Sequence, residues 1–265
     1  MGVVNVTPDS FSDGGRFADH DDAVAHGERL RVDGADILDI GGESTRPGAE
    51  RITPRDEYDR VIPVIERLAG AGALISIDTM NSTTAAAAIA AGARIVNDVS
   101  GGLADPELLA AVADTEADVV LQHWRGHSKD MYAGARYSDI VVEVIAELGL
   151  RIAAARAAGI PDERIIVDPG FGFGKTPEDN WALVRGLRGL AEGGHRVLIG
   201  TSRKRMLAVA GARAGIDVAG EASLDLATAV TSVLAAQSGV WAVRVHDVVA
   251  TRVALAVRDA WEGEA

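Results

Sequence analysis

The sequence alternates eight short apolar runs with longer amphipathic stretches, and this alternation restricts the possible folds more than any other feature. Runs rich in Val, Ile and Leu are typical of strands that are buried on both faces, as in parallel sheets. The eight runs cover residues 3–6, 37–40, 74–77, 94–96, 119–121, 165–167, 197–199 and 241–245. Eight strands that alternate with helices in 265 residues predict an α/β fold of the (β/α)8 TIM-barrel type.

The stretches between the runs carry signals for the start of a helix. Residues 53–56 (TPRD) and 176–179 (TPED) each combine an N-cap threonine, a proline in the first turn and an acidic third position. Residues 105–107 (DPE) have a similar composition, and we expect them to open a helix that runs through Val112. Pro63 lies inside the helical pattern that follows Thr53, where it predicts a kink.

No linker or change in composition divides the chain, so we expect residues 1–265 to form a single barrel domain. The alternative is a doubly wound open sheet, which ordinarily carries a glycine-rich fingerprint directly after its first strand. The first run is followed instead by residues 7–15 (TPDSFSDGG), a segment that is too long and lacks the glycine spacing. The barrel is therefore the favoured fold.

Composition excludes several classes of function. The chain has 39 acidic and 26 basic residues and a formal net charge of −13, which disfavours nucleic acid as a partner. It contains no cysteine, so disulfides, thiolate zinc sites and cysteine nucleophiles are ruled out. No apolar run has the length of a membrane span and no secretory signal is evident. We expect a cytoplasmic protein without a membrane partner.

Polar side chains lie at the ends of all eight apolar runs, where a (β/α)8 barrel places its active site. They are Asn5, Asp39, Asp78, Asn97, Asp98, Gln122, His123, Asp168, Ser202, Arg203, Lys204, Arg244, His246 and Asp247. A single aspartate at a strand end is more often a helix cap or a loop hydrogen bonder. That interpretation stays open for Asp39, Asp98 and Asp247, but eight polar strand ends together indicate a site.

The types of side chain indicate a ligand with two chemical parts. Asp78, Asn97 and Asp168 offer acceptors for the N–H and amino donors of a flat heterocycle. Lys204 and Arg244, from the last two strands, supply positive charge beside them.

The closing strands predict an anion site. Strand eight of a barrel lies next to strand one, so Arg244, His246 and Asn5 should be neighbours at the corner where barrels tend to bind phosphate. The Asn5 oxygen suits a magnesium ion that is shared with phosphate oxygens. The alternative for His246 is a hydrogen-bonded histidine of the core.

Two long loops follow the first two strands and are expected to act as lids over the barrel mouth. Phe11 lies in the first loop and Arg46 in the second. An aromatic ring and a guanidinium could cover an aromatic ligand and contact an anion.

With these residues in view, the sequence resembles the dihydropteroate synthase family. The motifs that carry the resemblance follow in family order, nearly end to end. They cover residues 2–15, 39–48, 76–79, 97–102, 168–176, 202–205 and 244–247. Signatures of this length and in this order are highly specific.

The resemblance implies condensation of a 7,8-dihydropterin-6-methyl diphosphate with 4-aminobenzoate, with Mg²⁺ as cofactor, in a homodimer. It implies pterin contacts from Asp78, Asn97, Gln122, Asp168, Lys204 and Arg244. It implies diphosphate contacts from Asn5, Arg244 and His246, with Asn5 reaching the metal. Phe11, Pro47, Phe173 and Lys204 would border the aminobenzoate, and the resemblance implies catalytic roles for Asp13, Arg46, Lys204, Arg244 and His246.

The sequence departs from the family pattern at two places. Family members commonly carry methionine where this chain has Gln122, whose amide must find a hydrogen bond when it is buried. Relatives also usually have a longer segment ahead of the first strand, so we expect Met1 to be an internal methionine of a longer product.

Three other functions fit the sequence less well. A methyltetrahydrofolate:corrinoid methyltransferase would share the barrel but would not need the cations Lys204, Arg244 and His246. A non-catalytic pterin-binding paralogue would not need the complete set of motifs. A lyase that forms a Schiff base through Lys204 finds no support in the remaining motifs.

Overall fold

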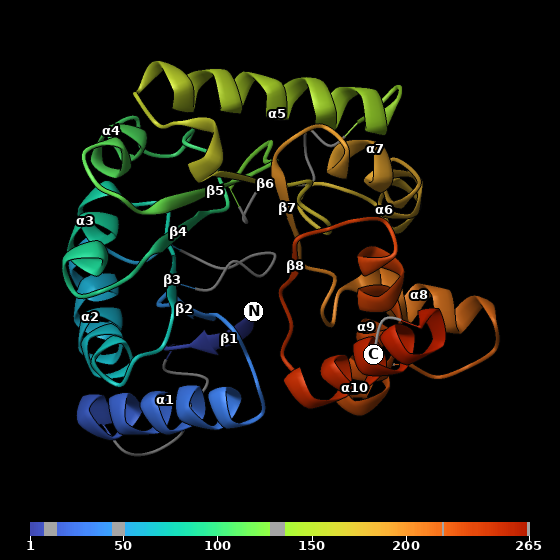
Figure 1. Ribbon diagram of the computed structural model, residues 1–265, viewed down its shortest axis with the longest axis horizontal. Helices are drawn as coiled ribbons and strands as arrows, with labels where there is room; N and C mark the ends of the chain where they lie inside the picture. The colour runs from blue at the N-terminus through green and yellow to red at the C-terminus, as the bar shows by residue number, and fades with distance from the viewer. Residues whose placement is uncertain (8–14, 44–50, 128–135, 219, 264–265) are drawn as a thin grey trace.

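Eight parallel strands form the centre of the molecule, and helices surround them (Figure 1). The computed structural model describes residues 1–7, 15–43, 51–127, 136–218 and 220–263. The strands are β1 (Gly2–Asn5), β2 (Leu38–Gly41), β3 (Ile75–Asp78), β4 (Ile95–Asp98), β5 (Asp118–Gln122), β6 (Ile165–Asp168), β7 (Arg196–Ile199) and β8 (Ala242–Val243). All eight predicted runs therefore contribute a strand.

The strands follow one another in sequence order, and the ring closes. Each strand pairs in parallel with the next one along the chain. A parallel bridge joins Gly2 to Val245, where the Val3 amide donates to the Val245 carbonyl at 3.1 Å. The predicted (β/α)8 barrel is confirmed, and the doubly wound open sheet is excluded because the first strand also pairs with the segment after the last.

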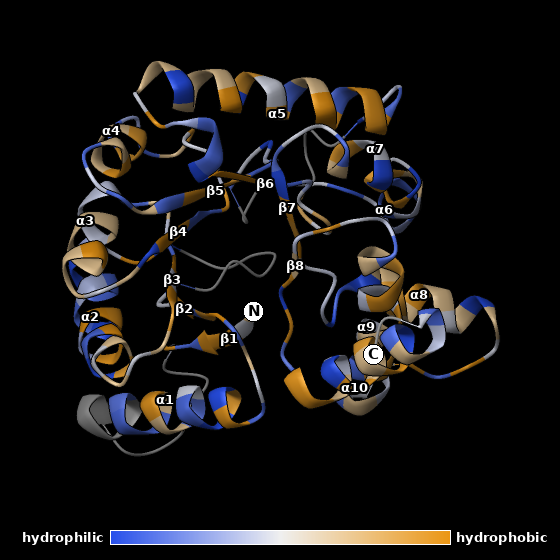
Figure 2. Ribbon diagram, viewed as in Figure 1, coloured by the Kyte–Doolittle hydropathy of each residue, from blue (hydrophilic) through white to orange (hydrophobic). Residues whose placement is uncertain are grey.

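The helices lie outside the strands, and most connect one strand to the next. They are α1 (Gly15–Val32), α2 (Pro54–Gly70), α3 (Ser82–Ala90), α4 (Leu108–Ala113), α5 (Ile140–Ala157), α6 (Pro177–Val184), α7 (Leu187–Ala191), α8 (Arg205–Arg213), α9 (Glu221–Ala236) and α10 (Val248–Glu262). Hydrophobic and hydrophilic residues alternate along them (Figure 2), as expected for helices with one face on a sheet. Among the described helices, none combines the length and apolar composition of a membrane span.

The helix-start signals are confirmed in two cases, and in the third the helix begins directly after the predicted residues. Thr53 caps α2, which continues through Pro63, and Thr176 forms a complete capping box with Asp179 at α6. The helix expected to open at residues 105–107 begins only at Leu108. One oxygen of the Asp105 carboxylate accepts from the Glu107 amide at the entry to α4, and the other accepts from the Ser82 amide at the start of α3.

The barrel interior has an apolar layer beneath a polar one. Buried side chains fill its centre, namely Met1, Ile37, Ile95, Val120, Ile166 and Leu198. Side chains two residues apart on a strand lie on the same face, so the next inward positions are Asp39, Asn97, Gln122 and Asp168. Four strands therefore each place a polar side chain above an apolar one, towards the carboxyl ends of the strands.

Candidate active site

Arg244 lies at the centre of the polar layer, between two carboxylates from neighbouring strands. Its Nε donates to Asp39 Oδ2 at 2.5 Å, and its Nη2 donates to Asp78 Oδ2 at 2.9 Å. Asn97 Nδ2 also donates to Asp39 Oδ2, at 3.1 Å. Asp39 is completely buried and orients Arg244 and Asn97, so it is neither a helix cap nor a loop hydrogen bonder.

Several buried polar atoms of this layer have no partner among the described residues. They are Asp39 Oδ1, Asn97 Oδ1 and Gln122 Nε2. An unpaired buried polar atom costs free energy. A ligand that brings both donors and an acceptor into the mouth would satisfy all three atoms.

Asp168 and Lys204 form the opposite side of the mouth. Asp168 Oδ1 accepts from the Gly170 amide at 2.7 Å. Burial raises the pKa of Asp168, while the charge of Lys204 opposes that shift. Burial has the opposite effect on a cation and lowers the pKa of Lys204 to about 8. The two groups therefore form an electrostatically coupled pair within the site.

Lys204 is held by the loop between β6 and α6. Its Nζ donates to the Phe171 carbonyl and lies 4.6 Å from the centre of the Phe173 ring. A Cβ on Gly172 would come within 2.8 Å of the Lys204 side chain, and Gly172 has a φ of +80°. Glycine at this position thus permits both the turn and the close approach of the lysine stem.

Lys204 and Arg244 lie close together over Gly200, which follows β7. A Cβ there would lie 3.7 Å from Arg244 Cβ and 4.0 Å from Lys204 Nζ. Because Gly200 has no side chain, Lys204 and Arg244 can both occupy the space above it. The arrangement provides strong positive charge next to the acceptors of β3, β4 and β6.

His246 and Asn5 lie on the two sides of the barrel closure. Ser202 Oγ is 2.8 Å from His246 Nδ1 and accepts from the His246 amide at 3.2 Å. A Cβ on Gly41 would lie 3.9 Å from Asn5 Oδ1 and 3.7 Å from Asp78 Oδ2. Asn5 therefore faces the same part of the mouth as Asp78, and His246 is a hydrogen-bonded ring at the adjoining strand end.

Two of the other aspartates stabilise local structure. Asp98 accepts from the Ser100 amide at 2.8 Å, the Ser100 hydroxyl at 2.7 Å and the Gly102 amide at 2.5 Å. Burial raises its pKa to about 6. Asp247 caps α10 by accepting from the Ala250 amide at 2.9 Å. The interpretation of both as structural residues is confirmed.

Four residues that the sequence nominates lie outside the described residues. They are Phe11, Asp13, Arg46 and Pro47. Their places in the site stay predictions.

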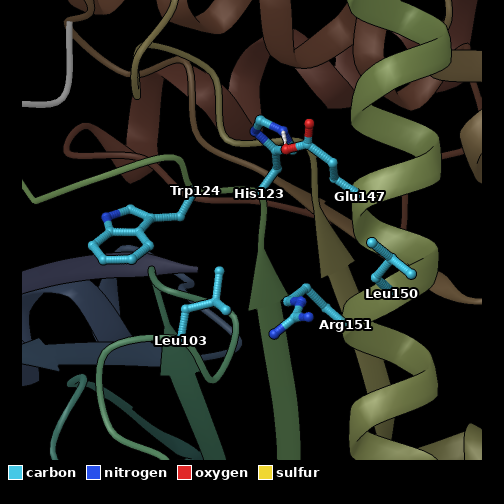
Figure 3. Close-up of a pocket in the computed structure, with 6 residues that line it drawn as sticks. All are labelled: Leu103, His123, Trp124, Glu147, Leu150 and Arg151. Atoms are coloured by element: carbon cyan, nitrogen blue, oxygen red, sulfur yellow. Dashed lines mark hydrogen bonds and ion pairs between the residues drawn. The ribbon is translucent and has the colours of Figure 1, made fainter. Parts of the chain in front are cut away.

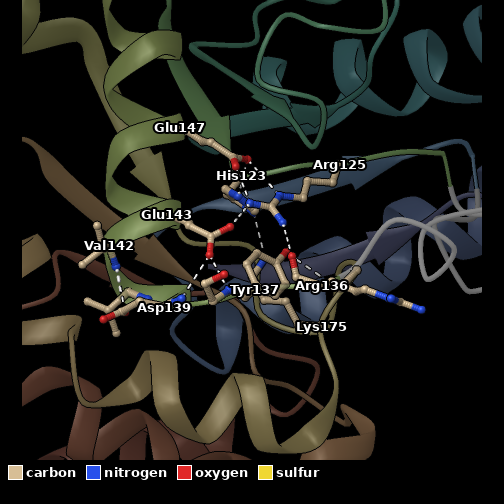
Figure 4. Close-up of polar contacts among 12 residues, drawn as sticks. His123, Arg125, Arg136, Tyr137, Asp139, Val142, Glu143, Glu147 and Lys175 are labelled. Carbon is tan, nitrogen blue, oxygen red and sulfur yellow. Dashed lines mark hydrogen bonds and ion pairs between the residues drawn. The ribbon is translucent and has the colours of Figure 1, made fainter.

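A network of polar side chains that the sequence does not predict lies next to the site. Lys175, from the loop between β6 and α6, contacts His123, which in turn contacts Glu147 of α5 (Figure 4). The sequence places His123 at a strand end but assigns it no role. Lys175 is one of only three lysines in the chain, and this rarity is the signal that could have indicated a function for its side chain.

A small pocket lies on the outer side of this network, between α5 and the segment after β4 (Figure 3). Its volume is about 120 Å³. The residues that line it are Leu103, His123, Trp124, Glu147, Leu150 and Arg151. It contains none of the residues assigned to the barrel mouth.

Comparison with known proteins agrees with this geometry. Residues 1–246 match the family described as "Pterin binding enzyme". The dihydropteroate synthase of Mycobacterium leprae is 49% identical over 262 residues, which are 98% of this chain and 92% of the relative. The solved structure of Xanthomonas albilineans dihydropteroate synthase with 4-aminobenzoic acid has a TM-score of 0.89 and 47% identity, and the match covers 99% of this chain and 92% of the other. A complex of the Xanthomonas enzyme with 7,8-dihydropteroate has a TM-score of 0.85 and 44% identity over the same shares.

The barrel and its polar mouth define a pterin-binding barrel enzyme, a class to which the family match assigns nearly the whole chain. Within that class, the chain belongs to the dihydropteroate synthase family, because its relatives of that name match it over almost their full length.

Proposed function

We propose that this chain condenses a 7,8-dihydropterin-6-methyl diphosphate with 4-aminobenzoate to form 7,8-dihydropteroate and pyrophosphate, in folate biosynthesis. The amine nitrogen forms a bond to the pterin methylene carbon, the bond from that carbon to the diphosphate oxygen breaks, and the amine proton leaves to solvent. The observation that carries the proposal is the convergence of Asp78, Asn97, Asp168, Lys204 and Arg244 on one mouth. The substrates follow from the relatives' activity and from the ligands in their structures.

The pterin ring would lie across the polar layer. Asp168 and the unpaired Asn97 Oδ1 accept from its amino and ring N–H groups. Gln122 Nε2 is also buried and unpaired, and in this role it donates to an acceptor of the ring. Asp78 stays beside the ring, with Arg244 packed against the ring.

The reaction needs positioning and charge stabilisation more than an activated nucleophile. Departure of the diphosphate leaves a cation that the electron-rich dihydropterin delocalises, and the aromatic amine is neutral at pH 7. Arg244 and His246 stabilise the negative charge on the departing diphosphate. Lys204, beside the Phe173 ring, borders the aminobenzoate together with Phe11 and Pro47.

The residues of the site are compatible with a shared magnesium ion. Within the described ranges, no cluster of three or more acidic or imidazole side chains could hold a metal by itself. Mg²⁺ typically uses one or two protein oxygens and takes its other ligands from substrate phosphates and water. Asn5 Oδ1, which faces the mouth beside Asp78, is such an oxygen, and the ion would neutralise charge on the diphosphate.

Asp13 and Arg46 are proposed to complete the site from the two lid loops. A carboxylate near the forming cation would favour its ionisation, so Asp13→Asn is expected to lower turnover. An Asp13→Asn protein with unchanged turnover and unchanged substrate binding would refute this role.

We also propose that the chain forms a homodimer through α9 and α10, which lie side by side (Figure 1). Large apolar side chains recur every four residues on both helices and are 50–88% exposed, namely Leu226, Val230, Leu234, Val249, Val253, Val257 and Trp261. Such a continuous apolar stripe is typical of an interface. A second copy, related by a two-fold axis, would cover it with the same stripe. A cytoplasmic location is part of the proposal because a diphosphate substrate does not cross a bilayer unaided.

The deciding experiment mixes the purified protein with the pterin diphosphate, 4-aminobenzoate and Mg²⁺ and measures pyrophosphate. Release that requires both substrates supports the synthase. No release above the background without protein would exclude it and would leave a pterin-binding paralogue. Methyl transfer from methyltetrahydrofolate without pyrophosphate release would favour the methyltransferase.

A further inference from the structure

The buried network behind the barrel mouth ends at Lys175, a lysine to which the proposed reaction assigns no role (Figure 4). Its side chain is only 2% exposed. A buried charge is costly unless it is hydrogen-bonded. The contacts of Lys175 therefore bear on why a lysine occupies this position.

Three acceptors surround the Lys175 ammonium. Its Nζ lies 2.9 Å from the Gly170 carbonyl, 3.1 Å from the Phe173 carbonyl and 2.9 Å from His123 Nδ1. His123 Nε2 lies 2.9 Å from Glu147 Oε2, and a carboxylate only accepts, so the imidazole proton is on Nε2 and Nδ1 is an acceptor. Three acceptors require three hydrogens, which only the charged form of lysine supplies.

The two carbonyls belong to the turn of residues 170–174. This turn contacts both Lys204 and Asp168 of the site. Three glycines give this turn little conformational restraint of its own, and their φ angles are positive, namely Gly170 (+69°), Gly172 (+80°) and Gly174 (+57°). The turn nevertheless places the Phe173 ring beside Lys204 and offers the Phe171 carbonyl to the same lysine. Something outside the turn must hold it in this shape.

We propose that Lys175 is a positioning residue for the aminobenzoate side of the site. Its ammonium binds two carbonyls of the turn of residues 170–174. It thereby fixes the Phe173 ring and the Phe171 carbonyl, which accepts from Lys204. The inference rests on the proposed function, in which Phe173 and Lys204 border the aminobenzoate. The pterin acceptors depend less on the turn, because they lie on strands of the barrel.

The outer members of the network support the same turn. Arg125 Nε donates to Glu147 Oε2 at 3.1 Å, and the Arg125 guanidinium lies 4.0 Å from the centre of the Tyr137 ring. The Tyr137 hydroxyl donates to the Gly174 carbonyl at 3.1 Å. The network therefore holds the turn at a third carbonyl and connects it to α5.

The charges that face Lys175 decide how easily it loses its proton. Burial is the largest influence and lowers the pKa of Lys175 to about 7. Asp168 and Glu147 favour the ammonium, whereas Lys204 and Arg125 oppose it. Glu147 is 37% exposed on its side chain and lines the pocket of Figure 3, so its charge can be changed without opening the core.

The first test is the variant Lys175→Met, which keeps an unbranched side chain only one atom shorter and removes the charge and all three hydrogen bonds. We expect the KM for 4-aminobenzoate to rise about tenfold or more. The pterin also contacts Asp168 and Lys204, which the turn bonds through the Gly170 amide and the Phe171 carbonyl, so its Kd, measured by calorimetry, should rise several-fold less than the aminobenzoate KM. Arg151→Gln is the matched control, because Arg151 lies one turn beyond Glu147 on α5 and lines the pocket beside it, while the network contacts described above do not include it; it should match the unaltered protein.

The second test is Glu147→Gln, which keeps an acceptor for His123 but removes the negative charge. Because Glu147 favours the ammonium, its loss lowers the pKa of Lys175 further. Loss of the Lys175 proton should raise the KM for 4-aminobenzoate, so the KM should increase with pH in the unaltered protein. In Glu147→Gln this increase should begin about half a pH unit lower, or more. A purely structural role for the network would not shift this profile.

Two results would overturn the inference. One is an unchanged aminobenzoate KM in folded Lys175→Met. The other, which decides the matter if Lys175→Met fails to fold, is an identical pH profile for Glu147→Gln and Arg151→Gln. Absence of pyrophosphate release from the unaltered protein would overturn the proposed function itself, together with this role.

Discussion

At the mouth of the barrel, Asp78 and Lys204 are each buried near a group of opposite charge. Burial raises the pKa of Asp78 to about 7, although Arg244 opposes the shift, and it lowers the pKa of Lys204 to about 8. Burial is the largest cause in both cases, because removing a charge from water outweighs the attraction of one neighbour. The site is therefore fully charged only in a narrow range of pH.

Pterin binding should be strongest between about pH 7 and pH 8. Below this range Asp78 gains a proton and loses its charge; above it Lys204 loses its proton and its charge. Calorimetry of pterin diphosphate binding across the range measures the profile. Lys204→Arg should flatten the alkaline decline, since arginine stays charged. Constant affinity through the alkaline range would contradict the assigned role of Lys204.

The negative charge and both acceptor oxygens of Asp168 should contribute to pterin affinity, beyond the shape of the side chain. Asp168→Asn keeps an oxygen for the Gly170 amide but replaces an acceptor for the pterin with a donor. We expect the Kd of the pterin to rise by about tenfold to a hundredfold, as for a lost charge-assisted hydrogen bond. Asp118→Asn on the far end of the barrel is the control, because Asp118 pairs with Arg196 at the start of β7.

At the scale of the elements, local capping positions the helices, and the strands position the site. The α6 capping box begins at Thr176, directly after Lys175, and ends the loop that carries Phe173. Capping satisfies amides that have no partner within the helix. The start of α6 and the end of the functional loop are thus determined at the same residue.

Removal of a cap should cost stability in proportion to the hydrogen bond lost. Thr53→Ala and Thr176→Ala are each expected to lower the free energy of unfolding by about 1 kcal/mol. Urea denaturation measures this change. Thr115→Ala offers a comparison outside a helix N-terminus, because its hydroxyl bonds the Val112 carbonyl and the Ala117 amide. Equal stability of Thr176→Ala and the unaltered protein would mean that the capping box contributes nothing.

At the scale of the whole molecule, two apolar layers leave an apolar face on α9 and α10 uncovered. The inner layer fills the barrel, and the outer layer lies between the strands and the helices. The stripe on α9 and α10 belongs to neither layer, since its side chains point to solvent. Both helices lie outside the ring of strands (Figure 1), so a second copy that covers the stripe would pack against the outside of the barrel.

A charge in the stripe should separate the proposed dimer. Val253→Glu places a carboxylate at a position that is 59% exposed, so the barrel should still fold. Sedimentation should then report a monomer, where the unaltered protein reports a dimer. Val142→Glu on α5 is the control, because Val142 is 63% exposed outside the stripe. A monomeric unaltered protein would contradict the proposed dimer.

The sequence by itself determined the eight strands, the barrel and the set of polar strand ends. Those features depend on local patterns, namely apolar runs, helix caps and the two-residue period that places Asp168 above Ile166. It did not predict the contact by which the Asp105 carboxylate also binds the distant Ser82 amide, because that contact depends on how α3 and α4 pack.

Only the tertiary structure decided how the polar groups are paired. Arg244 bonds Asp39 across 205 positions of sequence and Lys175 contacts His123 across 52. Such contacts depend on side-chain direction and burial, which appear only when the strands close into a ring. The same closure separated the aspartates that face the mouth from Asp98 and Asp247, which the sequence pattern alone could not distinguish.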